Sequence, residues 1–164
     1  MQMQERVTRE TVEGWVEDFG LQHQPHPMDD NPRFEWGLSV GGQAFGTIVA
    51  QLQVEFNYLT IQAPIAISKK HQAALRSLDD DTRTAFLYDL RLALHWRAVG
   101  HMIEFHIDES GTPTNLPVRV TLGMDLVEQP MARIDFFKAN RIVQTGAAVV
   151  ALTFQKMAHQ RSWP

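Results

Sequence analysis

The segments IEFHI (residues 103–107) and VRVTLGM (residues 118–124) decide the architecture of this chain. In both segments apolar residues alternate with other residues, which is the pattern of a strand that buries one face. Both strands arrive only after a long helical stretch. The predicted order is therefore helix, three strands, helical stretch, two strands and long helix.

An amphipathic helix is predicted near the N-terminus. Val12, Trp15, Val16 and Phe19 fall at i, i+3, i+4 and i+7, which places them on one side of a helix. Thr8 can cap its start, and a glycine at position 20 can end it. The following stretch HQPHPMDDNP (23–32) contains three prolines and predicts a loop.

A three-stranded meander is predicted next. The first strand covers 34–40, where apolar residues occupy every second position, and Gly41-Gly42 marks a hairpin turn. The second strand runs over about 44–52, and the third follows a tight turn near Gln53. The run Ala63-Pro64-Ile65-Ala66-Ile67 is expected to end the meander, because its proline cannot donate a hydrogen bond within a central ladder.

Helices occupy most of the remaining chain. Ser68 can cap a helix through Leu78, and the DDDT segment (79–82) can cap a second helix that ends at Gly100. After the two late strands, a last helix is predicted over 131–157. The sequence thus predicts a single α+β domain over 1–164, with a five-stranded antiparallel sheet packed against helices in the order α-βββ-α-ββ-α.

Composition restricts the classes of function. The 164 residues include no cysteine, so the chain forms no disulfide and has no thiolate nucleophile, which fits a cytoplasmic location. A net charge of −4 argues against a nucleic-acid partner. No apolar run has the length of a signal peptide or a membrane span, so a membrane partner is not expected either.

The sequence lacks the common signatures of catalytic and cofactor-binding sites, so the prediction of function does not rest on them. The seven histidines lack the spacing of a metal site, and the serines and glycines lack nucleophile and phosphate-binding motifs. We predict no catalytic residue, no metal and no cofactor. The alternative is a small-molecule enzyme or ligand-binding protein that uses a polar sheet face of Glu35, Glu55, Glu104, His106 and Arg119. An apolar ligand between sheet and helices would need a cavity of a few hundred Å³.

The middle helix carries two apolar stripes. Phe86, Leu87, Leu90 and Leu94 form one of them, and Tyr88, Leu92, Trp96 and Val99 form the other. One sheet face covers only one stripe, and soluble monomers rarely leave a large apolar patch exposed. The last helix is also apolar around most of its circumference over 142–154. We therefore expect the Tyr88, Leu92, Trp96 and Val99 stripe to form a homodimer interface. The alternative is that the first and last helices fold over this stripe within the monomer.

The layout resembles a known family. Together with the strings VEGWVEDFG (12–20) and FLYDLRLAL (86–94), it resembles an uncharacterised family of bacterial and archaeal proteins with a type III secretion chaperone-like fold. The resemblance implies an antiparallel sheet packed against helices and a homodimer in many relatives. We accordingly expect a non-catalytic, cytoplasmic binding or chaperone-like protein that acts as a homodimer on a protein or peptide partner.

Overall fold

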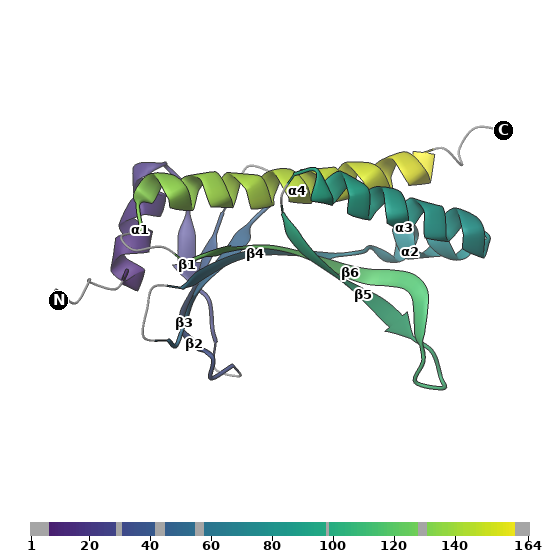
Figure 1. Cartoon of the computed structure of the whole chain (residues 1–164), viewed down its shortest axis with the longest axis horizontal. Coiled ribbons are helices and arrows are strands. Elements are labelled where there is room, and N and C mark those ends of the chain that lie inside the picture. Colours follow the sequence, from purple (N-terminus) through teal and green to yellow (C-terminus); the bar gives the residue numbers. More distant parts are fainter. Residues whose placement is uncertain are drawn as a thin grey trace. The chain divides into compact units, whose positions relative to one another are not determined.

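The computed structural model describes residues 7–28, 31–41, 45–54, 58–97, 99–127 and 131–159 (Figure 1). Over these residues the element order is α1 (Arg9–Asp18), β1 (His23–Pro25), β2 (Phe34–Val40), β3 (Thr47–Leu52), β4 (Leu59–Ala66), α2 (Lys69–Arg76), α3 (Asp80–His95), β5 (Gly100–Ile107), β6 (Pro113–Leu126) and α4 (Arg133–His159). The strand order in the sheet is β1-β2-β3-β4-β6-β5. The chain forms two compact units, one with residues up to Ala63 and Gly123–Gln144, the other with Pro64–Leu122 and residues from Thr145 onward.

The predicted α+β class and the antiparallel sheet are confirmed, but the predicted number of five strands is wrong. The sheet has six strands, because β1 forms within the stretch predicted as a loop. Its residues pair antiparallel with β2, and Pro25 lies opposite Leu38. Because β1 is an edge strand, a proline is tolerated there. Whether the two compact units form the predicted single domain stays a prediction.

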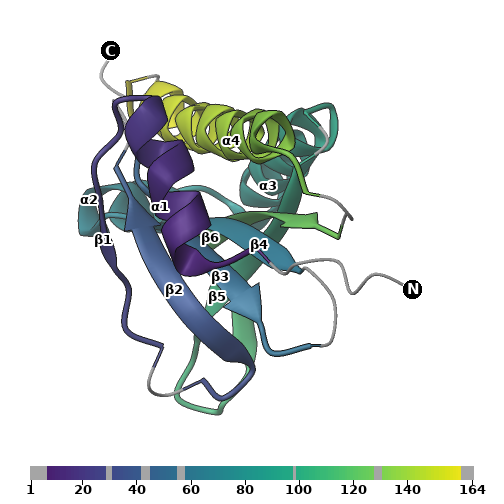
Figure 2. The same cartoon turned by 90° about the vertical axis from the view of Figure 1, so that its left-hand side faces the viewer.

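The first unit packs α1 across β2 (Figure 2). The predicted start of α1 is confirmed, because the Thr8 hydroxyl accepts a hydrogen bond from the backbone N–H of Thr11 at 3.2 Å. Gly20, just after the helix, has a φ of 66°, a left-handed conformation that glycine adopts without strain. Val12 and Val16 are fully buried. The periodicity of this helix therefore identified its buried face.

The meander pairs as predicted, with different strand limits. Val40 lies opposite Thr47 in the β2–β3 pair, and Gly42 of the predicted hairpin lies outside the described residues. β4 begins at Leu59 and continues through Pro64 to Ala66, so it ends within the run 63–67 that was predicted to end the meander. The pairing of β3 with β4 ends where Ile48 lies opposite Gln62, so the proline follows the β3 pairing and interrupts none of its hydrogen bonds.

The second unit contains α2, α3, β5 and parts of β4, β6 and α4. Both predicted helix starts are confirmed: the Ser68 side chain accepts from the N–H of His71, and the Asp79 carboxylate accepts from the N–H of Thr82. α3 ends at His95 rather than at the predicted Gly100, because β5 begins at Gly100. α4 is one uninterrupted helix of 27 residues, which confirms the long last helix.

Candidate functional site

Among the described residues of the predicted polar sheet face, Glu104 and Arg119 form an ion pair. Glu104 on β5 and Arg119 on β6 approach to 3.4 Å between Oε2 and Nη1, and both side chains are partly exposed. His106 is exposed further along β5, where its backbone carbonyl accepts a hydrogen bond from the Thr114 hydroxyl. Glu35 is exposed on β2 in the first unit. Glu55 lies outside the described residues. The enzyme alternative therefore has the Glu104–Arg119 pair as its structural support.

The β5–β6 turn contains a carboxylate with a shifted pKa. The hydroxyl of Ser110 and the N–H of Thr112 donate hydrogen bonds to Asp108, and they lower the pKa of that carboxyl together with the positive charge that His106 can carry. The same hydrogen bonds fix the conformation of the turn. They give Asp108 a structural role at the end of the strand that carries Glu104 and His106.

The predicted interface stripe on α3 is exposed for three of its four residues. Tyr88 is 65% exposed, Leu92 is 40% exposed and Trp96 is 78% exposed. Val99, in contrast, is buried, so its assignment to an exposed stripe is wrong. The reason is that the helix ends at His95, which places Val99 in the connection to β5, where one of its methyl groups lies 3.2 Å from the position that a Cβ on Gly146 would occupy.

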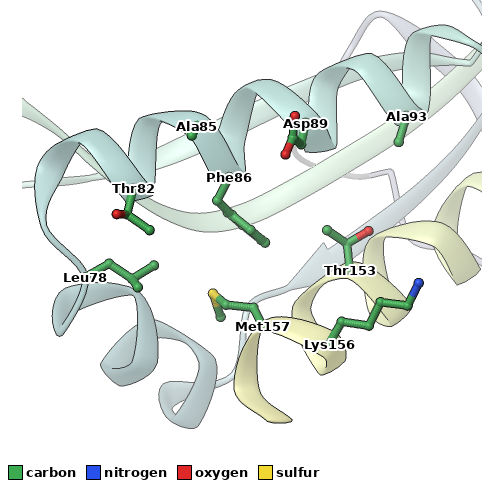
Figure 3. A pocket seen from close by; sticks show the side chains of 9 residues that line it. All are labelled: Leu78, Thr82, Ala85, Phe86, Asp89, Ala93, Thr153, Lys156 and Met157. Atoms are coloured by element: carbon green, nitrogen blue, oxygen red, sulfur yellow. The ribbon is translucent and has the colours of Figure 1, made fainter. Parts of the chain in front are cut away.

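Beside this stripe, α3 and the C-terminal part of α4 enclose an open groove of about 650 Å³. Figure 3 shows the side chains that line it: Leu78, Thr82, Ala85, Phe86, Asp89 and Ala93 on one side, and Thr153, Lys156 and Met157 on α4. The Phe86 ring meets the ring of Phe154 edge to face, with centroids 5.1 Å apart. The groove thus offers an apolar floor with Asp89 and Lys156 at its walls, a surface suited to an apolar side chain of a partner.

Sequence reasoning missed this groove. Phe86 was correctly placed on an apolar stripe of α3, but the partner helix α4 begins far along the chain. The spacing of Thr82, Phe86, Asp89 and Ala93, at i, i+4, i+7 and i+11, is the only signal that the sequence offers, and a charged residue interrupts its apolar character.

A second pocket of about 310 Å³ lies where β4 ends and α2 begins. Ile65, Ile67 and Phe154 contribute apolar surface, and Ser68 and His71 contribute polar atoms. The Ser68 Oγ and His71 Nδ1 atoms are 3.1 Å apart, which resembles a serine–histidine pair. This contact belongs to the cap of α2, because the same Oγ accepts from the His71 N–H.

Comparison with known proteins assigns the family. A family model described as "Uncharacterized conserved protein (DUF2299)" matches residues 8–154. The chain belongs to the DUF2299 family. The crystal structure of an uncharacterized protein from Methanothermobacter thermautotrophicus is similar in fold, with a TM-score of 0.74 and 17% sequence identity over 93% of this chain and 97% of that chain. No curated protein matches the sequence.

In the part of this DUF2299 chain that the structure describes, histidine, aspartate and glutamate side chains do not gather in groups of three that could hold a metal ion. None of its described helices combines the length and the apolar composition needed to cross a membrane.

Proposed function

We propose that this DUF2299 protein is a non-catalytic, chaperone-like binding protein of the cytoplasm that acts as a homodimer on a protein or peptide partner. The observation that carries the proposal is the exposed apolar surface of α3, where Tyr88, Leu92 and Trp96 lie beside an open groove. Contiguous apolar patches of this kind mark interaction sites in soluble proteins. The absence of cysteine supports the cytoplasmic part of the proposal.

The exposed aromatic side chains would supply part of the free energy of association. A tyrosine or tryptophan can bury about 150–250 Å², so the exposed parts of Tyr88 and Trp96 amount to about 300 Å² in each chain. Covering both copies would remove about 600 Å² from water, a gross gain of about 15 kcal/mol at 25 cal/mol/Å². Association costs about 4–15 kcal/mol in lost motion. Leu92 and the groove must therefore contribute to the interface as well.

The mass of the protein in solution tests the homodimer. We expect the wild-type chain to have twice its sequence mass by light scattering, and Leu92→Asp to give folded monomers, because a charge in the interface would lose its hydration. Ile134→Asp is a matched control, since Ile134 is 55% exposed on the part of α4 in the first unit. It should leave the dimer intact. Circular dichroism checks that both variants fold.

A wild-type chain that stays monomeric at high micromolar concentration would refute the homodimer. If Leu92→Asp instead unfolds the protein, Leu92 belongs to the core of a monomer, and the exposed stripe has been misassigned.

The partner is tested separately. Wild-type protein and the two variants are used as baits in a native lysate at physiological salt, and captured proteins are identified by mass spectrometry. We expect the wild type and Ile134→Asp to retain the same protein, and Leu92→Asp to retain less of it. Repeated recovery of nothing above background would count against a protein partner.

A further inference from the structure

The exposed stripe and the groove lie on neighbouring strips of the same helix. Ala85, Tyr88, Leu92 and Trp96 follow one another at spacings of three and four residues, and Phe86, Asp89 and Ala93 run beside them. Because an α-helix turns about 100° per residue, the two strips are about a quarter turn apart. The buried residues Leu87, Leu90 and Leu94 occupy the other side of α3. Both strips therefore open on the side of the helix away from its core contacts.

α4 also carries an exposed apolar residue beside the groove, outside its lining. Leu152 is exposed on α4, next in sequence to Thr153 and one turn before Lys156, both of which line the groove. Figure 3 shows Phe86 and Met157 directed into the space between the two helices. The second unit thus presents large apolar knobs on α3 and an apolar hole next to them.

From this juxtaposition we propose that two copies of the chain dock face to face, so that Tyr88 and Trp96 of each copy enter the groove between α3 and α4 of the other. The inference rests on the proposed function, because it takes the homodimer as its starting point, and it names the surface that the second copy fills. A two-fold axis that crosses α3 runs the two copies of this helix antiparallel, and every contact then occurs twice.

The volume of the groove and the area of the exposed side chains are compatible with a second copy of the chain as the occupant. A cleft of about 650 Å³ has the size of sites that hold a drug-sized ligand, about 300–1,000 Å³, so it has room for large aromatic side chains. A stable interface needs about 600–1,000 Å² from each partner. Tyr88 and Trp96 supply about 300 Å² of this. The exposed parts of Leu92 and Leu152, together with the groove lining, lie next to them and extend the same surface.

The charges of α3 also favour an antiparallel second copy. Its first turn carries the acidic residues Asp80 and Asp81, and its last turn carries His95, with Arg91 and Arg97 close by. Antiparallel packing brings the acidic end of each helix toward the basic end of the other and opposes their dipoles favourably. An unrelated apolar helix would fill the groove but would have to supply a second hole for Trp96. The chain itself supplies both parts.

Cysteine cross-linking tests the placement of α3, because the wild-type chain contains no cysteine. In Leu92→Cys, the middle of the stripe approaches its own copy across the axis. A disulfide needs Cα atoms within about 7 Å. We expect mild oxidation to convert most of this variant into covalent dimer, whereas Ile134→Cys, exposed in the first unit, should remain uncross-linked at the same concentration.

A substitution that fills the groove tests whether the aromatic side chains of the second copy dock there. Thr153→Arg places a long side chain into the groove from α4 and leaves the α3 stripe unchanged. We expect it to raise the dissociation constant of the dimer at least tenfold. Gln155→Arg is the matched control, because Gln155 lines the pocket where β4 ends and α2 begins and is not part of the groove lining, so its dissociation constant should equal that of the wild type. Circular dichroism verifies the fold of both.

The outcomes separate this inference from the proposed function. A dimeric wild type whose dissociation constant is unaffected by Thr153→Arg overturns the docking in the groove and leaves the homodimer standing. Absence of cross-linking in Leu92→Cys, with a dimeric wild type, overturns the two-fold contact at α3. A monomeric wild type overturns the homodimer itself.

Discussion

The buried side chain of Gln51 provides a sharp test of the core of the first unit. Gln51 lies on β3 between Trp36 of β2 and Leu59 of β4, and it is fully buried. Within the described residues, neither its amide nitrogen nor its amide oxygen has a hydrogen-bond partner. Leaving a buried amide unsatisfied costs about 1–3 kcal/mol in proteins. We therefore expect Gln51 to destabilise the fold that surrounds it.

Replacing Gln51 with methionine should remove this cost and keep the packing. Methionine is similarly long and unbranched, and its thioether adapts to irregular space. Gln51→Met is expected to raise the free energy of unfolding by about 1–3 kcal/mol. For a chain of this size each 1 kcal/mol corresponds to about 2–4 °C in Tm. Urea unfolding and a thermal melt, both followed by circular dichroism, measure the change.

Asn140 is a buried amide of the same unit whose side chain, unlike that of Gln51, has a hydrogen-bond partner. Its side-chain oxygen accepts a hydrogen bond from the Thr47 hydroxyl at 2.7 Å, and both residues are buried. Asn140→Leu would leave that hydroxyl unsatisfied and should cost about 1–3 kcal/mol. If Gln51→Met also lowers the stability, the Gln51 amide is hydrogen bonded in solution, through a buried water or a rearranged neighbour, and the reasoning is refuted.

Further predictions concern glycine positions and a tyrosine. Gly14→Ala on α1 should stabilise the protein by about 1 kcal/mol, since no neighbouring atom lies within 4 Å of the new Cβ. Gly146→Ala should bring no gain in stability, because Leu122 and Val99 methyl groups lie 3.0 and 3.2 Å from the position of its Cβ. Urea unfolding of both variants measures the difference in stability. The hydrogen bond from Tyr58 to Asp125 raises the pKa of the Tyr58 hydroxyl, so its stabilisation is present below the unfolded pKa of tyrosine and is lost as pH rises through the folded pKa. Asp125→Asn should therefore shift phenolate absorbance to lower pH, and an unchanged titration would contradict the assignment.

Local signals in the sequence were sufficient for the helices. Thr8, Ser68 and Asp79 each accept a hydrogen bond from a backbone N–H three residues later, so each helix start depends on a short segment that can be recognised by residue type. The end of α3 was harder to place. Apolar residues continue beyond His95 at helical spacing, and only the pairing of β5 stops the helix.

Features that depend on distant segments escaped prediction. β1 is a strand because the backbone of β2 pairs with it, and nothing in its proline-rich sequence favours an extended ladder. Pro64 is tolerated in β4 because it follows the last pair with β3. The groove forms where α3 meets a helix more than fifty residues later. In each case the deciding partner is tertiary, so periodicity and residue type could not reveal it.

The causes of the pKa shifts and the exposed apolar surface of α3 both bear on the proposed function. The resolved pKa shifts have hydrogen bonds as their largest cause: backbone N–H groups at the helix starts lower the pKa of Glu10 and Asp79, the Ser110 hydroxyl lowers that of Asp108, and Asp125 raises that of Tyr58. These interactions stabilise helix starts, a turn and a side-chain contact, whereas catalytic groups owe their shifts to burial and to charged neighbours in a cleft. The exposed apolar side chains of α3, in contrast, would gain free energy if an interface removed them from water. A surface of this kind gains free energy by association, which is the basis of the proposed binding role.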